Sequence, residues 1–135
     1  MSYAQWILLQ IINRLQSGKL SVKNARLDWG KFYEWDDKNK DTTADAVNAV
    51  TVAPGETGLV ASCGKSDAAS GTEGYLDLYD GDTKICTVYW SVPWGSKYNT
   101  FTIQDRNPGY LISVSDWNQS HGGIGKVELE IAKKS

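Results

Sequence analysis

The sequence predicts an all-β protein, an antiparallel β-sandwich of about nine or ten short strands that forms a single domain over residues 1–135. Three observations support this prediction. The length of 135 residues fits one domain with one core, apolar and polar residues alternate with a period of two in several segments, and turn-forming residues separate those segments. No long segment repeats its apolar residues at the helical period, so we expect little helix.

The predicted strands follow one another along the whole chain. The first, residues 5–12 (QWILLQII), is apolar on both faces and is expected to be a central strand that is buried on both sides. In the later strands only every second side chain is apolar, which is typical of a strand with one face toward the core. The side chains expected at core-facing positions are Leu76 and Leu78, Cys86, Val88 and Trp90, Phe101 and Ile103, and Val127, Leu129 and Ile131.

The segments between the strands contain turn-forming residues. Two segments deviate from the strand pattern. Residues 42–50 (TTADAVNAV) are expected to form one helical turn, and the charged residues 34–41 (EWDDKNKD) are expected to form a solvated loop. Turn signals lie at 17–19, 54–58, 70–74, 80–82, 107–109 and 121–125.

The composition is that of an ordinary folded domain, because 41% of the residues are hydrophobic and 22% are charged. The formal net charge is -2 and the isoelectric point is about 5.3, so the charge gives no reason to expect nucleic acid as a partner. Cys63 and Cys86 are too few for a disulfide framework. Two buried thiols and a single bridge both fit the sequence.

The N-terminus lacks the features of a secretory signal, since residues 1–14 contain neither a basic region nor a small-residue cleavage site. The apolar run at 6–12 is much shorter than the roughly 20 residues that a membrane-spanning helix needs. We therefore expect a protein that is soluble as made. It would be cytoplasmic in the producing cell or secreted without a conventional signal.

Two short motifs approach known ligand-binding loops but lack their key residues. Residues 63–66 (CGKS) resemble the end of a phosphate-binding P-loop, but Leu59 stands where the first glycine of that motif is needed. Residues 37–41 (DKNKD) have the initial spacing of a calcium loop, but Thr42 replaces its glycine and Asn48 replaces its closing glutamate. The sequence therefore predicts neither a nucleotide site nor a calcium site.

Catalytic motifs are also missing from the sequence. His121, the only histidine, lies in a glycine-rich turn, and no serine or cysteine stands in a recognisable nucleophile motif. No spacing of His or Cys suits a metal ion. A pair of glycosidase carboxylates stays open, because their separation depends on the fold. On balance we expect a protein that is not an enzyme, with no catalytic residue, no metal and no cofactor.

The aromatic residues give the clearest functional indication. Six Trp and seven Tyr accompany only two Phe, and Trp and Tyr are favoured where an apolar ring meets water or a headgroup. Trp94 lies between Pro93 and Gly95 in a predicted loop, and Trp29 ends a predicted strand just before a glycine. Both rings are therefore expected at the surface, where they would line a binding site.

Three kinds of ligand fit exposed indole rings. Lipid headgroups and the interfacial region of a bilayer accept Trp and Tyr for the reason just given. Sugars stack on indole faces, as in a lectin-like carbohydrate-binding module, and the cation of a choline or ethanolamine headgroup is attracted to the same faces by about 1–2 kcal/mol. Lys97, which follows Trp94 closely, is placed to contact the phosphate of such a headgroup. Trp90 fits either the core or the same surface, because it alternates with core-facing residues.

Four segments of the sequence resemble the aegerolysin family, a group of small β-sandwich proteins from fungi and bacteria that bind membrane sphingolipids. The segments are YAQW at 3–6, WGK at 29–31, CGKSDAASGTEG at 63–74 and YWSVPWGSKYNTF at 89–101. The last segment is long and unusual in composition, which makes the resemblance specific. Length and layout agree to the C-terminus.

The resemblance implies a membrane-targeting component that docks on sphingolipids and recruits a larger partner with a membrane-attack-complex/perforin domain, which makes the pore. Some such pairs are haemolytic and some are insecticidal. The implied lipids are sphingomyelin with cholesterol and ceramide phosphoethanolamine. The protein would act peripherally on target-cell membranes, where a homodimer or homo-oligomer is left open. The residues that the resemblance implies in lipid binding are Trp6, Trp29, Tyr89, Trp90, Trp94 and Lys97.

Two positions depart from the better-known fungal members. Ser70 stands where they have an acidic residue that influences the dependence on cholesterol. Ser70 is therefore included among the lipid-binding candidates, and the need for sterol stays open. Val92 stands where they have a cysteine, so the resemblance gives no reason to pair Cys63 with Cys86.

Overall fold

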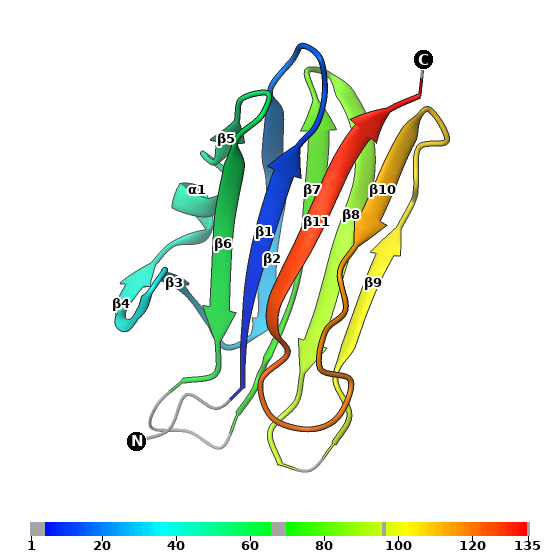
Figure 1. The fold of residues 1–135 in the computed structure, drawn as a ribbon. Helices are drawn as coiled ribbons and strands as arrows, with labels where there is room; N and C mark the ends of the chain where they lie inside the picture. Colours follow the sequence, from blue (N-terminus) through cyan, green and yellow to red (C-terminus); the bar gives the residue numbers. More distant parts are fainter. Residues whose placement is uncertain (1–4, 66–69, 96, 135) are drawn as a thin grey trace.

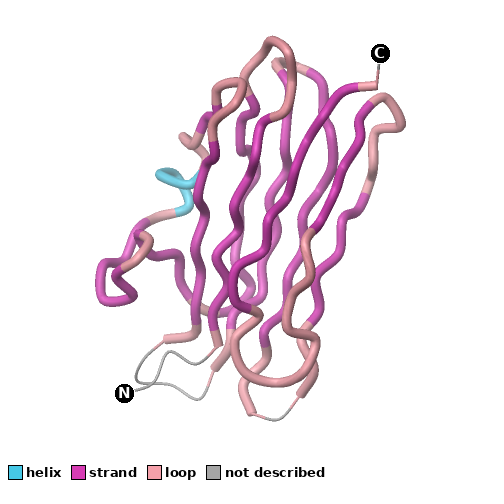
Figure 2. The backbone as a smooth tube through the Cα atoms, viewed as in Figure 1, coloured by secondary structure: helices cyan, strands magenta, loops and turns pink. Residues whose placement is uncertain are grey.

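The computed structural model of the protein describes residues 5–65, 70–95 and 97–134. Two sheets pack face to face as a sandwich (Figure 1), which confirms the predicted all-β class. The described residues form eleven strands, slightly more than the nine or ten expected, and one short helix. Figure 2 shows that strands make up the body of the molecule and that the helix lies at one edge.

The first sheet contains six strands in the order β10-β11-β1-β6-β3-β4. Strand β1 pairs antiparallel with β6 and parallel with β11. The other neighbouring strands of this sheet are antiparallel. The six strands are β1 (Trp6–Asn13), β3 (Lys31–Glu34), β4 (Asp37–Thr42), β6 (Thr57–Cys63), β10 (Tyr110–Val114) and β11 (Gly125–Lys133).

The second sheet contains five strands in the order β5-β2-β7-β8-β9 and is antiparallel throughout. Three long neighbouring strands, β2, β7 and β8, form its centre and run the length of the sandwich (Figure 1). The five strands are β2 (Leu20–Trp29), β5 (Thr51–Val52), β7 (Thr72–Asp80), β8 (Thr83–Val92) and β9 (Thr100–Gln104).

The core lies between the two sheets and is filled by the alternating apolar side chains. The core-facing residues predicted on β7, β8 and β11 are all buried, so the period-two pattern placed these strands correctly. Ile85 is buried beside its neighbour Cys86, which breaks the alternation. The break coincides with a register shift between β7 and β8 after Leu78, because a bulge brings two consecutive side chains to the same face.

Strand β1 is buried on both faces along its first half. Leu8 points away from the main core but is only 1% exposed, because a small second cluster covers it. Gln10 and Ile12, further along the same face, are half-buried. The predicted two-sided burial therefore holds for the first half of the strand. The second cluster consists of Leu8, Tyr33, Ala61 and Cys63, with Trp6 packed against it.

The charged segment 34–41 is a β-hairpin and not the solvated loop predicted from the sequence. Strand β3 ends at Glu34, and β4 returns from Asp37 to pair with it. The Lys31 ammonium supports the hairpin, because Nζ lies 2.5 Å from an Asp41 carboxylate oxygen and 2.7 Å from the carbonyl oxygen of Lys38. The strand was missed because β4 has charged or polar side chains on both faces and shows no alternation.

The expected helical turn within residues 42–50 is confirmed as α1 (Ala44–Val47). Its N-cap is Thr43, whose hydroxyl oxygen accepts a hydrogen bond from the amide of Ala46 at 3.1 Å.

The turn signal at 70–74 is wrong for its last three residues, because β7 already begins at Thr72. The early start of β7 extends the second sheet toward the lower end of the sandwich.

Both cysteines are buried free thiols, which decides between the two alternatives left by the sequence. Burial raises the pKa of Cys63 to about 11 and that of Cys86 to about 12, so both remain protonated at neutral pH.

In the described part of the chain, no helix reaches the length and hydrophobicity that crossing a bilayer requires.

Candidate functional site

An open pocket of about 450 Å³ lies at the lower end of the second sheet. It forms where β2 ends, β7 begins and β8 ends. Two glycines make this junction possible: a Cβ on Gly30, which has a positive φ of 90°, would lie 2.6 Å from the Cys63 carbonyl oxygen, and a Cβ on Gly71 would collide with the Val92 carbonyl. The strand ends can therefore approach closely enough to enclose the pocket.

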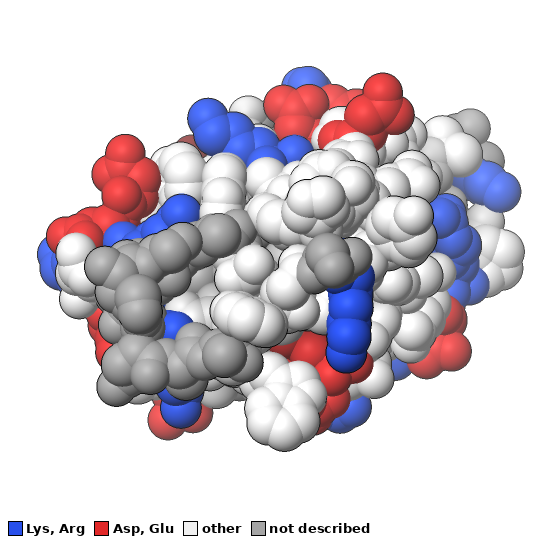
Figure 3. All heavy atoms as spheres, turned by 90° about the horizontal axis from the view of Figure 1, so that it is seen from below, with Lys and Arg blue, Asp and Glu red and all other residues white. Residues whose placement is uncertain are grey.

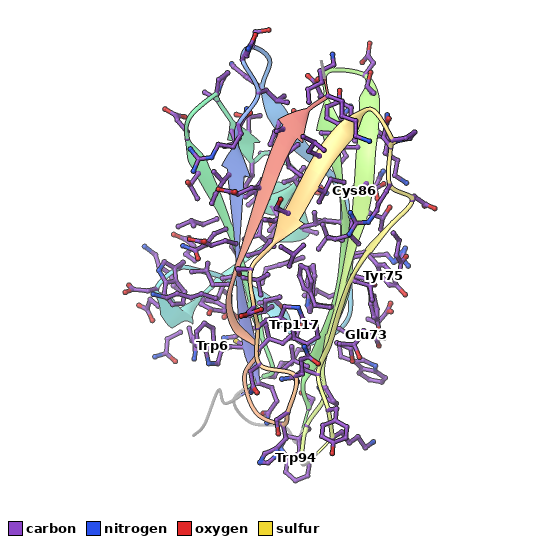
Figure 4. The ribbon with its side chains drawn as sticks, turned by 45° about the vertical axis from the view of Figure 1, so that its right-hand side comes forward. Trp6, Glu73, Tyr75, Cys86, Trp94 and Trp117 are labelled. Atoms are coloured by element: carbon purple, nitrogen blue, oxygen red, sulfur yellow. The ribbon has the colours of Figure 1, made fainter. Side chains whose placement is uncertain are left out.

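Two exposed indole rings line this pocket. Trp29 is 64% exposed and Trp94 is 55% exposed. Trp29 is the last residue of β2, and Trp94 follows Pro93, the first residue after β8. Figure 4 shows Trp94 at the lower tip of the molecule. Large apolar rings that are left in water at one site are typical of a binding surface.

Polar and charged side chains complete the lining. Lys97, Ser70 and Glu73 face the pocket together with the two indoles. The Ser70 hydroxyl oxygen is buried and has no hydrogen-bond partner among the residues that the structure describes. Among the residues that the structure describes, neither Lys97 nor Glu73 forms an ion pair. The pocket thus combines two apolar rings with one unpaired cation and one unpaired anion.

Trp90 lies behind the pocket in the core. The sequence had left two alternatives for this ring, the core and the binding surface, and the structure places it in the core. Its side chain is only 1% exposed, and its ring packs edge-on against Phe32 at a centroid distance of 6.4 Å. The indole Nε1 donates a hydrogen bond of 3.2 Å to Thr72 Oγ1, which also shares a 2.5 Å hydrogen bond with Ser62 Oγ. Because Thr72 lines the pocket, Trp90 supports the wall and does not face a ligand.

Tyr89 lies beside the pocket on the outer face of the second sheet. Its hydroxyl donates a hydrogen bond to a carboxylate oxygen of Glu73, and its ring lies 4.8 Å from that of Tyr75. Desolvation, followed by the hydrogen bond and charge of Glu73, raises the pKa of Tyr89 to about 12. Tyr89 is therefore a protonated donor at neutral pH and reaches the pocket through Glu73.

Trp6 lies away from the pocket, in contrast to the other candidates. It packs on the outer face of the first sheet, with its ring stacked on Trp35 at 5.7 Å and the Lys38 ammonium 4.6 Å from its centre. Figure 4 shows Trp6 and Glu73 on opposite sides of the sandwich. The fold thus brings Trp29, Ser70, Trp94 and Lys97 into one pocket, places Tyr89 beside it and separates Trp6 from it.

Glu73 is a charged pocket residue that was not predicted from the sequence, because it belongs to a segment with a turn signal. Its register in the sheet places it opposite Trp29 on β2 and Ser91 on β8. Tyr75 lies on the outward face of β7, and Glu73 stands two residues before it. Side chains two residues apart in a strand share a face, so this pattern could have identified Glu73 as a surface residue of the same strand.

Figure 3 shows the pocket end of the molecule from below. Uncharged side chains occupy much of its centre, and basic and acidic side chains lie among and around them. No group of three or more His, Cys, Asp or Glu side chains within residues 5–65, 70–95 and 97–134 is arranged to hold a metal ion. The lining of the pocket is chemically suited to bind a small zwitterion between the two indole rings.

Fold and site together define a small β-sandwich protein with an aromatic pocket at one end. The model of the family described as "Aegerolysin" matches residues 4–134. The chain belongs to the aegerolysin family, which confirms the resemblance seen in the sequence.

Two relatives with known names and one solved structure support the assignment. The chain is 47% identical to "Asp-hemolysin" of Aspergillus fumigatus, over 98% of this chain and 96% of that protein. It is 37% identical to "Ostreolysin A6" of Pleurotus ostreatus, over 99% of both chains. The crystal structure of RahU protein in complex with a TRIS molecule superposes with a TM-score of 0.94 at 35% identity, covering 99% of this chain and 98% of that one. The chain is therefore a cytolysin-related protein.

Proposed function

We propose that the protein binds sphingolipid headgroups in the pocket and acts as the membrane-targeting component of a two-component pore-forming cytolysin or insecticidal toxin. The observation that carries this proposal is the meeting of Trp29, Trp94 and Lys97 around one open pocket at the end of a rigid sandwich. The lipids proposed are sphingomyelin and ceramide phosphoethanolamine, with or without sterol.

The chemistry of the lining suits such a headgroup. Its cation would lie against the faces of Trp29 and Trp94, an attraction of about 1–2 kcal/mol when water is excluded. Its phosphate would accept charge-assisted hydrogen bonds from the Lys97 ammonium. The Ser70 hydroxyl, which has no partner within residues 5–65, 70–95 and 97–134, would be a further donor. A volume of about 450 Å³ lies in the range of small-molecule sites.

The position of the pocket favours peripheral binding. Because Trp94 lies at the tip of the molecule (Figure 4), the protein can meet a membrane end-on while both sheets stay in water. Indole rings are favoured in the interfacial layer of a bilayer. The described strands are all held in two sheets around one core, and inserting them would require that core to open. We therefore expect weak permeabilisation by the protein alone and assign the pore to a partner with a membrane-attack-complex/perforin domain.

Co-sedimentation with liposomes tests the proposal. Vesicles that differ only in headgroup, with and without sterol, should retain the protein when they contain sphingomyelin or ceramide phosphoethanolamine. A Trp94→Ala variant should bind these vesicles more than about tenfold more weakly, because a ring that anchors a headgroup makes a large contribution. Leu111→Ala is the matched control, since Leu111 is also exposed but lies on β10 in the upper part of the sandwich.

Three outcomes would contradict parts of the proposal. Unchanged affinity of a stable Trp94→Ala variant would reduce that ring to a packing role. Glycan binding that persists while all sphingolipid vesicles fail to bind would favour the lectin-like alternative, because the same indoles can stack on sugars. Lysis of target cells by the pure protein, at the concentrations of a dedicated pore former, would contradict the division of labour with a partner.

A further inference from the structure

Glu73 gives the pocket a carboxylate at a defined place. It is the second residue of β7, and its Cα stands between those of Trp29 on β2 and Ser91 on β8. All three residues line the pocket, as does Lys97. The wall of the pocket therefore presents an anion directly beside an exposed indole ring, with a cation on the same lining.

A fixed hydrogen bond orients this carboxylate. Tyr89 donates its hydroxyl to Glu73 Oε2, and the Tyr89 ring is itself held against Tyr75, over which the Arg26 guanidinium lies at 4.0 Å. The pKa of Tyr89, about 12, keeps the hydroxyl protonated. Among the described residues the Glu73 side chain makes no other hydrogen bond and no ion pair. The second carboxylate oxygen, Oε1, thus has no donor in the described part of the chain.

An oriented carboxylate distinguishes between the two common cationic headgroups. The primary ammonium of ethanolamine has three N–H donors and can form a short, charge-assisted hydrogen bond to a carboxylate. The quaternary ammonium of choline has no N–H and spreads its charge over methyl groups, so its main attraction is to the faces of aromatic rings. Both cations can lie against the ring faces of Trp29 and Trp94, but only the ammonium of ethanolamine can also donate a hydrogen bond to Glu73.

We propose that Glu73 is a specificity-determining residue that binds the primary ammonium of a phosphoethanolamine headgroup and sets the preference for this headgroup over phosphocholine. Lys97 binds the phosphate of the same zwitterion, so the two unpaired charges of the pocket match the two charges of the ligand. The inference rests on the proposed function, because it assigns a role to one residue within the proposed headgroup site.

A single substitution with a matched control tests the inference. Glu73→Gln removes the charge but keeps an oxygen that can accept the Tyr89 hydrogen bond. Binding to phosphatidylcholine vesicles that contain ceramide phosphoethanolamine should weaken by about tenfold, because one charge-assisted hydrogen bond is lost. Binding to vesicles that contain sphingomyelin should change by less than about twofold. Glu128→Gln, an equal charge change on the exposed face of β11, should leave both affinities unchanged.

A third set of vesicles identifies the source of the headgroup. Phosphatidylethanolamine carries the same phosphoethanolamine on a glycerol backbone. Equal binding to both ethanolamine lipids would assign recognition to the headgroup alone, and binding to the ceramide lipid only would add a contact with the ceramide backbone. In either case the inference expects the Glu73→Gln loss on every ethanolamine vesicle that retains the wild-type protein.

Failure of the inference is distinguishable from failure of the proposed function. If Glu73→Gln binds ethanolamine vesicles like wild type while Trp94→Ala does not, the role of Glu73 is overturned and the headgroup site stands. Equal losses on ethanolamine and choline vesicles would overturn the discriminating role. If the wild-type protein binds no vesicle, both are overturned.

A competition experiment on the wild-type protein makes the test independent of the fold of a variant. Soluble phosphoethanolamine should displace the protein from ceramide phosphoethanolamine vesicles at about tenfold lower concentration than soluble phosphocholine. Equal potency of the two compounds would overturn the inference. Tryptophan fluorescence, recorded during the same titration, reports occupancy of the pocket because Trp29 and Trp94 line it.

Discussion

Two groups of tryptophans in this molecule differ in whether other side chains of the protein contact the faces of their rings. Trp6 and Trp35 stack on each other at 5.7 Å, and cations lie over both rings, with Lys38 4.6 Å from the centre of Trp6 and Lys126 5.7 Å from that of Trp35. In the pocket, Trp29 and Trp94 make no ring or cation contact with other described residues. The first group already holds its cations within the protein, and the second has its ring faces free for a ligand.

The contrast shows that the number of tryptophans does not identify a binding site. An indole whose faces are covered by protein contributes to packing, whatever its distance from the surface. An indole whose faces are open, next to an unpaired charge, has the properties of a binding residue. Stability and lipid binding should therefore separate when each group is altered in turn.

The largest effect is expected when both open rings are removed. A Trp29→Ala, Trp94→Ala double variant should lose about a hundredfold or more in affinity for sphingolipid vesicles, because two anchors of one site are absent. Its melting temperature should stay close to that of wild type, since both rings are largely exposed. Tyr98→Ala is the control, because Tyr98 is 78% exposed and near Lys97 in sequence but lines a different hollow. A large loss of affinity in that control would break the contrast between the two groups.

The covered group should give the reverse result. Trp6→Ala removes a half-buried ring from the small cluster of Leu8 and Tyr33 and should lower the free energy of unfolding by about 1–3 kcal/mol. Its vesicle affinity should change by less than about threefold. Denaturant unfolding and co-sedimentation of the same preparation measure both quantities. A strong loss of binding without loss of stability would instead support the role in membrane activity that family resemblance implies for Trp6.

Sequence reasoning located the features that depend on neighbours along one strand. β7, β8 and β11 were predictable because a buried face imposes alternation, and the exposure of Trp29 and Trp94 followed from their places next to Gly30 and Pro93. Features that depend on contacts between strands were not accessible in the same way.

Three cases illustrate those missed contacts. The charged strand β4 is stabilised by Lys31 of its neighbour β3 and has no pattern of its own. Glu73 joins the site only because the register aligns it with Trp29 and Ser91 on adjacent strands. Trp6 and Trp94 look alike in the sequence, and packing against Trp35 separates them.

The smallest effect concerns the tyrosine that joins the pocket to the sheet. The folded-state pKa of Tyr89, about 12, lies above the ordinary tyrosine pKa of about 10, so its stabilising contribution is complete below about pH 10 and is lost as the pH rises toward 12. Tyr110 behaves alike, because burial, followed by the 2.7 Å hydrogen bond that its hydroxyl donates to Asp80, raises its pKa to about 12. The free energy of unfolding should therefore fall over this pH range.

A Tyr89→Phe variant isolates the contribution of Tyr89 to this loss of stability at alkaline pH. It removes the hydroxyl that donates a hydrogen bond to Glu73, so the decline in stability above pH 10 should become shallower. The remaining slope is due to Tyr110 and to other buried tyrosines such as Tyr33, whose pKa is also raised by burial. Denaturant unfolding at several pH values, with tyrosinate absorbance recorded in parallel, measures the change. An identical slope in wild type and Tyr89→Phe would mean that the hydroxyl is equally solvated in both states, and the oriented carboxylate of Glu73 would then lose its support.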